Sequence, residues 1–152
     1  MQRSRSALVV AATPSLATHL GAWLKMDGWQ VITVRSYPEA KARLTHDVDL
    51  VVTELELGDY NGLQLALRAQ KDEVPVLVIG RQDEAFRRDA EQLGSTYLSR
   101  EHLDRERFLL AVSVKLDAMR YATPFYRRDL EFLRRPWSST RSASVSRRML
   151  LH

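Results

Sequence analysis

The chain has 152 residues, 45% of them hydrophobic, which suits one folded domain with a short appendage and argues against wholesale disorder. It contains no cysteine, which excludes disulfides, thiolate metal sites and a cysteine nucleophile and fits a reducing, cytoplasmic setting. The formal net charge of +4 is uneven: residues 1–119 hold 15 Lys and Arg against 17 Asp and Glu, whereas residues 120–152 hold 8 Arg against 2 acids.

Short apolar runs alternate with amphipathic stretches over the first 120 residues. Five apolar runs predict buried strands, at Ala7–Val10, Trp29–Val34, Leu50–Thr53, Val76–Ile79 and Tyr97–Leu98. Helical spacing and end signals predict helices from Thr13-Pro14 to Gly28, from Ser36 through Leu44, from Leu63 to about Lys71, at Glu84–Leu93 and at about Leu103–Ala122. The first apolar run is too short for a signal-peptide core or a membrane span, so we expect no membrane partner.

Alternating strands and helices predict an α/β fold with a doubly wound, five-stranded parallel sheet. In such folds the working surface lies beyond the carboxyl ends of the strands. Residues Ala11, Ala12, Glu54, Gly80 and Arg100 follow strand ends and are expected there.

The sequence changes character after Ala122. Thr123-Pro124 has the pattern of a helix start, and Pro136 would stop that helix, so we predict an additional C-terminal helix over residues 123–136. Its apolar residues are Phe125, Leu130 and Leu133. Residues 137–152 are rich in Ser and Arg and are predicted to be disordered when alone.

The pattern over residues 6–120 resembles the receiver domain of two-component response regulators. In that family the first strand runs into an acidic pair that binds Mg²⁺, and here "ALVVAATPSL" has Ala11 and Ala12 at those positions. The third strand ends in the phospho-acceptor Asp, and here "LVVTELELGDYNGL" has Glu54. The resemblance implies a flavodoxin-like receiver fold over residues 1–122.

The switch positions of the family also differ. The fourth strand of a receiver ends in Thr or Ser, and here "PVLVIGR" has Gly80. The fifth strand carries an aromatic residue and then Lys, and here "TYLSR" has Tyr97 and Arg100. Because Gly80 has no hydroxyl group, we expect Tyr97 to be an ordinary packed residue.

These departures favour a pseudo-receiver that works without phosphorylation, metal or cofactor. Phosphoryl transfer to a carboxylate needs Mg²⁺, which prefers several hard oxygen ligands, and the two alanines supply none. We predict that Glu54 forms an ion pair with Arg100, with Arg81 nearby, because an unpaired carboxylate near the sheet is costly. The alternative is a solvated surface carboxylate. No phosphate loop, zinc-protease motif or nucleophile elbow is present, so we predict that the chain is not an enzyme.

The resemblance also implies protein partners, such as a signalling kinase, a regulator or a transcription component, or a second copy in a homodimer. Receivers commonly use the face of the fourth helix, fifth strand and fifth helix. On that face the candidate contact residues are Arg87, Arg88, Arg105 and Arg107, mixed with acids that include Asp89. A plain solvated surface explains the same charges.

The basic tail permits other functions. Its Arg and Trp residues could bind nucleic acid by phosphate contact and base stacking, the candidates being Arg134, Arg135, Trp137, Arg141, Arg147 and Arg148. The helix over residues 123–136 could instead dock on the domain, on a second copy or on a partner. The chain could also be a truncated regulator without its output domain.

Overall fold

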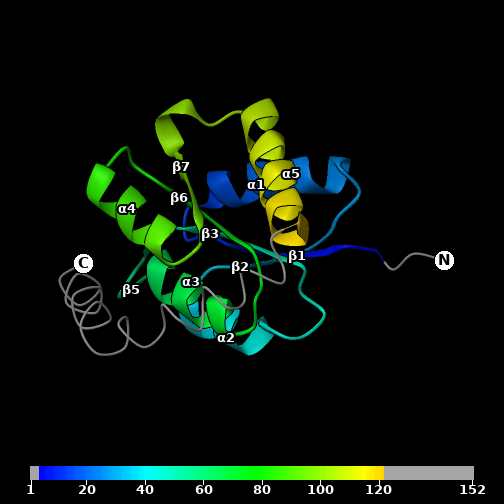
Figure 1. The fold of residues 1–152 in the computed structure, drawn as a ribbon, viewed down its shortest axis with the longest axis horizontal. Coiled ribbons are helices and arrows are strands. Elements are labelled where there is room, and N and C mark those ends of the chain that lie inside the picture. Colours follow the sequence, from blue (N-terminus) through cyan, green and yellow to red (C-terminus); the bar gives the residue numbers. More distant parts are fainter. Residues whose placement is uncertain (1–3, 122–152) are drawn as a thin grey trace.

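The computed structural model describes residues 4–121 of the chain. A five-stranded parallel sheet in the order β2-β1-β3-β6-β7 forms its centre (Figure 1). The strands are β1 (Ser6–Val10), β2 (Gln30–Val34), β3 (Leu50–Glu54), β6 (Val76–Gly80) and β7 (Thr96–Ser99). All residues of β3 and β6 are buried, as expected of central strands that are covered on both faces. The predicted doubly wound parallel sheet is confirmed.

Within residues 4–121, five α-helices form two layers around the sheet. They are α1 (Pro14–Met26), α2 (Tyr37–Arg43), α3 (Gly62–Lys71), α4 (Glu84–Gln92) and α5 (Arg105–Tyr121). One core cluster joins α1 and α5 to one face of the sheet, with Leu20 and Phe108 among its fully buried side chains. The other cluster joins α2, α3 and α4 to the opposite face, through residues such as Ala40, Leu63 and Phe86.

Most predicted element ends lie within two residues of the observed ones. Strand β2 begins at Gln30 rather than Trp29, because the Trp29 amide donates to the Leu24 carbonyl at 3.0 Å and closes the end of α1. Helix α5 begins at Arg105 rather than Leu103, since a short 3₁₀ turn, η1 (Arg100–His102), comes first.

The loop between β3 and α3 contains a small hairpin that the apolar pattern did not predict. Strands β4 (Glu56–Leu57) and β5 (Tyr60–Asn61) pair antiparallel across a turn at Gly58, whose φ is +67°. Leu57 is buried in the core, and the Tyr60 ring stacks on Tyr37 of α2 at 4.9 Å between centroids. These contacts fix the loop against the domain.

Helix α3 begins directly after this hairpin. The Asn61 side chain accepts hydrogen bonds from the amides of Leu63 and Gln64, and the Gln64 side chain accepts from the Asn61 amide, which completes a capping box. A Cβ atom at Gly62 would lie 2.6 Å from the Glu54 carbonyl oxygen, so only glycine fits where α3 meets the end of β3. The helix start therefore holds the end of β3 in place.

Candidate functional site at the carboxyl ends of the strands

Glu54 is the last residue of β3 and is one of few buried charged residues in the described chain. Its residue exposure is 5%, and its neighbour Thr53 is fully buried. Such burial excludes the interpretation of Glu54 as a solvated surface carboxylate. A carboxylate in this position needs hydrogen-bond donors, because burial removes the water that would otherwise solvate its charge.

Thr13, at the start of α1, supplies two of those donors. Its hydroxyl group donates to Glu54 Oε1 at 2.6 Å, and its backbone amide donates to Oε2 at 3.2 Å. Thr13 occupies the N-cap position of α1, yet its side chain makes no capping hydrogen bond. The hydroxyl binds the carboxylate instead, so α1 is linked directly to β3.

Arg100 supplies the third donor, from the η1 turn after β7. Its Nη2 atom lies 3.2 Å from Glu54 Oε1 and 3.1 Å from the Thr13 hydroxyl. The predicted ion pair between Glu54 and Arg100 is therefore present. A single guanidinium nitrogen is shared between Glu54 and Thr13, so the contact is not a two-bond pair of guanidinium and carboxylate. The Arg100 side chain remains 46% exposed, against 7% for Glu54.

The Mg²⁺ ion that the receiver resemblance implies does not fit these residues. Ala11 and Ala12, at the acidic-pair positions, carry no side-chain oxygen, and Ala11 is buried beside β2. Thr13 and Arg100 bind both oxygens of Glu54. Mg²⁺ requires several oxygen ligands in near-octahedral order. Across residues 4–121, no three His, Asp or Glu side chains gather closely enough to hold a metal ion.

Gly80, at the end of β6, makes room for the Tyr97 hydroxyl group. A Cβ atom at Gly80 would lie 2.5 Å from the Tyr97 hydroxyl oxygen and 2.9 Å from Leu55 Cβ. Tyr97 is only 3% exposed, and its hydroxyl donates to the Arg81 carbonyl at 2.5 Å. The position where a receiver carries a hydroxyl side chain is thus filled by the ring of its neighbour strand.

The Tyr97 phenol stays neutral over a wide pH range. Burial raises its pKa to about 12, and the nearby Asp83 carboxylate acts in the same direction. Arg87 covers the ring from outside, with its guanidinium carbon 5.6 Å from the ring centroid and Nη1 3.4 Å from the Tyr97 carbonyl. Tyr97 is therefore packed, as predicted, and it is also enclosed by Arg87, which the sequence did not indicate.

Next to the switch residues, Glu101 closes the loop between β7 and α5. Its carboxylate accepts from the Ser99 hydroxyl at 2.6 Å and from the Gln82 amide at 3.0 Å. The hydrogen bond from Ser99 lowers the pKa of this carboxyl group.

Arg81 was expected near Glu54, and its guanidinium lies over the Phe86 ring, 5.9 Å from the centroid. Phe86 belongs to α4, and the groups that bind Glu54 come from Thr13 and Arg100 rather than from Arg81.

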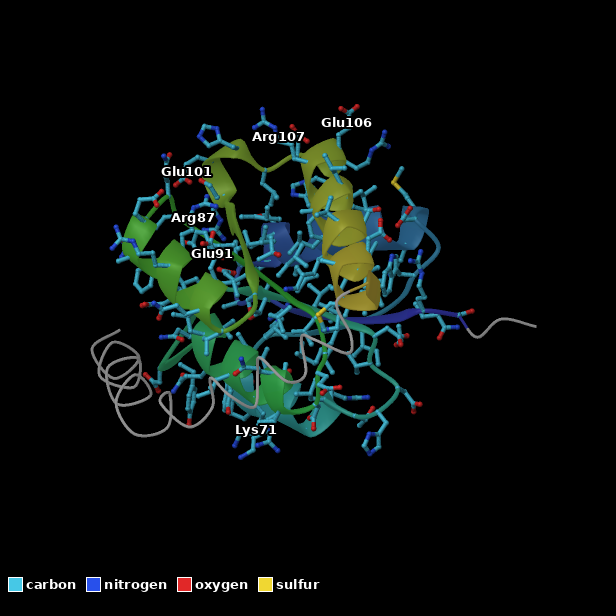
Figure 2. All side chains as sticks on the ribbon, in the orientation of Figure 1. Lys71, Arg87, Glu91, Glu101, Glu106 and Arg107 are labelled. Carbon is cyan, nitrogen blue, oxygen red and sulfur yellow. The ribbon has the colours of Figure 1, made fainter. Side chains whose placement is uncertain are left out.

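The candidate contact arginines are not equivalent. Figure 2 shows Arg87 on α4 beside β7 and Arg107 at the start of α5. Arg107 pairs with Asp104 at 3.7 Å and donates to the His102 carbonyl, which holds its side chain at the start of α5. The helix is capped by Asp104, whose carboxylate accepts from the Arg107 amide at 2.8 Å. Arg88 and Arg105 are exposed. Asp89, expected among the surface acids of this face, is 7% exposed, since it lies on the buried side of α4.

The remaining candidates lie outside the described residues. They are the apolar residues of the predicted C-terminal helix, Phe125, Leu130 and Leu133, and the tail residues Arg134, Arg135, Trp137, Arg141, Arg147 and Arg148.

Sequence reasoning missed Thr13 as a member of the site. It was interpreted only as a helix cap, which is the usual role of Thr before Pro. One signal was available: Thr13 directly follows the two positions where a receiver carries its acidic pair. Its contact with Glu54 joins residues 41 positions apart, and only the parallel pairing of β1 with β3 brings them together.

No helix among the described residues is both long and apolar enough to cross a membrane. No protein-family model matches the chain, and no curated protein matches it.

Solved structures do match the chain. A CheY-like receiver domain protein from Methanospirillum hungatei JF-1 is 16% identical, covers 78% of this chain and 98% of its own, and superposes with a TM-score of 0.71. A two-component response regulator from Clostridium difficile is 19% identical, with coverages of 76% and 98% and a TM-score of 0.69. The non-phosphorylated HemR receiver domain from Leptospira biflexa is 25% identical, with coverages of 74% and 94% and a TM-score of 0.67. The chain therefore has the fold of the response regulator receiver domains, in agreement with the resemblance seen in its sequence.

Proposed function

We propose that the chain is a phosphorylation-independent receiver module that acts by protein–protein contact in signal transduction and catalyses no reaction. The observation that carries the proposal is the state of Glu54. Both oxygens of its carboxylate accept hydrogen bonds, from Thr13 and from Arg100. A carboxylate held in this way is a poor nucleophile toward phosphorus, and Ala11 and Ala12 leave no ligand set for the Mg²⁺ that would screen two anions.

The packing at Gly80 supports the same proposal. A receiver that responds to phosphorylation needs a hydroxyl group that can approach the new phosphoryl group. Here the Tyr97 hydroxyl fills that space and is bonded to the Arg81 carbonyl. The ion pair at Glu54 and the enclosed Tyr97 hold the strand ends in one arrangement. We infer that the module presents a constant surface to its partner.

Phosphoryl analogues test this function directly. The full chain is incubated with beryllofluoride and Mg²⁺, or with acetyl phosphate and Mg²⁺, and is followed by intact mass and by amide NMR shifts. We expect no adduct, and no shift at Glu54, Gly80 or Tyr97 beyond that caused by Mg²⁺ alone. A stoichiometric adduct, or saturable shifts at these residues, would contradict the proposal.

The partner-binding face is proposed to lie on α4, β7 and α5. Leu110 and Val114, one helical turn apart on α5, are 65% and 59% exposed. Exposed apolar residues at this spacing suit a helix face that a protein covers. Arg88 and Arg105 add exposed positive charge on α4 and α5. The partner would be a signalling kinase, a regulator, a transcription component or a second copy, in the cytoplasm.

Nucleic-acid binding is the second candidate function. It is supported by the tail, in which 8 of the 10 charged residues after residue 119 are Arg. Contacts of this kind release counterions, so the affinity would fall steeply with salt. Fluorescence anisotropy with single-stranded and duplex oligonucleotides between about 50 and 200 mM salt measures this dependence. Absence of any salt-sensitive binding would remove the candidate.

A further inference from the structure

A groove crosses the end of the domain at which α5 finishes. Its larger part, about 470 Å³ in volume, lies where α2 and α3 end and is lined by residues including Leu44, Asp49 and Asp72. A separate depression of about 20 Å³ adjoins it, with Glu73, Val74 and Pro75 in both linings, and is also lined by Met119, in the last described turns of α5. The two hollows together are called the groove. The groove therefore reaches the point where the chain continues into residues 122–152.

The lining of the groove combines apolar and acidic groups. Leu44, Val74, Pro75 and Met119 are half-buried, so part of each apolar side chain faces solvent. The carboxylates among the lining residues are Asp49, Asp72 and Glu73. The basic residues Arg43 and Lys71, at the ends of α2 and α3, are next to lining residues in the sequence but do not line the groove themselves. Such a surface suits a segment with apolar residues along one side and arginines beside them.

We propose that the chain's own segment 123–136 docks in this groove. The segment carries the apolar residues Phe125, Leu130 and Leu133 and the arginines Arg127, Arg128, Arg134 and Arg135. With Asp129 and Glu131 counted against these four arginines, segment 123–136 has a net charge of +2. The groove is lined by the carboxylates Asp49, Asp72 and Glu73, so the charges of groove and segment are complementary. The inference does not depend on the proposed function.

Geometry favours this occupant over a second copy. Helix α5 is described as far as Tyr121, and the predicted C-terminal helix starts at Pro124, so only Ala122 and Thr123 lie between the two in the sequence. A helix of this length spans about 18 Å, which is about the size of one domain face. A short connection also gives an effective concentration in the millimolar range, well above that of a second molecule in dilute solution.

Hydrogen exchange on the full chain tests the docking. We expect amides of residues 125–135 to exchange at least about tenfold more slowly than in an unstructured peptide, at a rate independent of protein concentration. Exchange at the rate of an unstructured peptide would overturn the proposal. Protection that rises with protein concentration would also overturn it, in favour of a second copy.

Charge reversal identifies the groove as the binding surface. In the variant Asp72→Lys/Glu73→Lys we expect the protection of residues 125–135 to be lost, because the groove would repel the arginines. Leu130→Ser/Leu133→Ser should have the same effect from the side of the segment. Glu106→Lys, near the opposite end of α5 (Figure 2), makes the same kind of charge change and should leave the protection intact.

Exchange of β3 amides in the same experiment shows whether each variant is folded. If protection of residues 125–135 survives in Asp72→Lys/Glu73→Lys while β3 stays protected, the groove is not the docking surface and the proposal fails. A beryllofluoride response of the same chain would contradict the proposed function and leave the docking result untouched.

Discussion

Glu54 shows at the scale of single residues how a buried charge is retained. Its carboxylate would be strongly destabilising without donors, and the fold supplies them from α1 and from the turn after β7. The Thr13 hydroxyl both donates to Glu54 and accepts from Arg100, so the three side chains form one network. Loss of one member leaves the others poorly satisfied.

Arg100→Ala tests the contribution of the ion pair. We expect the free energy of unfolding to fall by about 1–2 kcal/mol, less than for a fully buried pair, because the Arg100 side chain is half exposed. Urea denaturation measures the loss. Arg88→Ala makes the same truncation at an exposed arginine of α4 and should change the free energy by less than about 0.5 kcal/mol. Equal effects of the two variants would mean that the pair contributes nothing.

Gly80→Ala tests whether Tyr97 occupies the space beside β6. The new methyl group would meet the Tyr97 hydroxyl and Leu55, so we expect the free energy of unfolding to fall by about 1–3 kcal/mol. Tyr97→Phe removes the nearest atom, and the cost of Gly80→Ala should be smaller in that background. Thermal and urea unfolding of the wild type, the two single variants and the double variant form the double-mutant cycle.

Gly21→Ala is the matched control for this substitution. The nearest atoms to a Cβ atom at Gly21 lie 3.9 Å away, so there is room for the methyl group. Because Ala favours helix more than Gly by about 1 kcal/mol, α1 should be unchanged or stabilised. Equal destabilisation at both glycines would show that the Tyr97 contact is not the cause.

At the scale of elements, β6, β7 and α4 are joined through Tyr97. The ring belongs to β7, its hydroxyl binds the loop after β6, and Arg87 of α4 covers it. In the loop after β3, the β4–β5 hairpin is fixed by the buried Leu57 and by the stacked Tyr37 and Tyr60 rings. The loops after β3 and β6 are therefore both fixed by contacts with neighbouring elements.

Lys115 joins α5 to the loop between α4 and β7. Its ammonium group donates to the Gly94 carbonyl, and burial lowers the pKa of this lysine. A base with a lowered folded-state pKa binds fewer protons in the folded state, so its contribution to stability rises as the pH increases toward 10.5. The pKa of Tyr97 is raised instead, so its contribution to stability falls as the pH increases.

The alkaline pH dependence of stability tests the environment of Tyr97. The unfolded phenol loses its proton near pH 10, whereas the folded phenol keeps it to about 12. The contribution of the neutral Tyr97 phenol to stability is therefore fully present below pH 10 and is lost between pH 10 and about 12. We expect the stability of the wild type, relative to Tyr97→Phe, to fall over this range. The contribution of Lys115 cancels in the difference, and a flat difference would contradict a buried phenol.

At the scale of the whole domain, residues 4–121 combine strand ends that are bonded to their neighbours with an exposed apolar pair on α5. The strand ends carry the bonded Glu54 and Tyr97, while Leu110 and Val114 stand exposed on α5. A module of this kind would signal by where it binds rather than by a change of its own shape.

Leu110→Ser/Val114→Ser tests the proposed contact face at this scale. Because both side chains are exposed, we expect the free energy of unfolding to change by less than about 1 kcal/mol. Self-association, measured by sedimentation, or capture of a purified partner should weaken by at least about tenfold, as expected when apolar contacts are lost. The pair Met26→Ser and Ile32→Ser removes two other exposed apolar side chains and serves as control. Equal binding by the two double variants would place the contact elsewhere.

The amino-acid sequence by itself determined the succession of strands and helices along the chain and, through its resemblance to receivers, the fold. Apolar runs such as Leu50–Thr53 can be satisfied only by a sheet covered on both faces. A cap signal such as Ser36 acts locally, since its hydroxyl accepts from the Glu39 amide three residues on. The sequence also indicated that Glu54 would need a cationic partner, because its position follows a buried strand.

Only the tertiary structure decided how these residues are satisfied. The Thr13 hydroxyl donates to Glu54 instead of capping α1, and the Tyr97 side chain fills the space at Gly80. Both contacts join residues far apart in the chain, so no local pattern encodes them. They follow from the parallel register of β1, β3, β6 and β7, which brings the strand ends within hydrogen-bond distance.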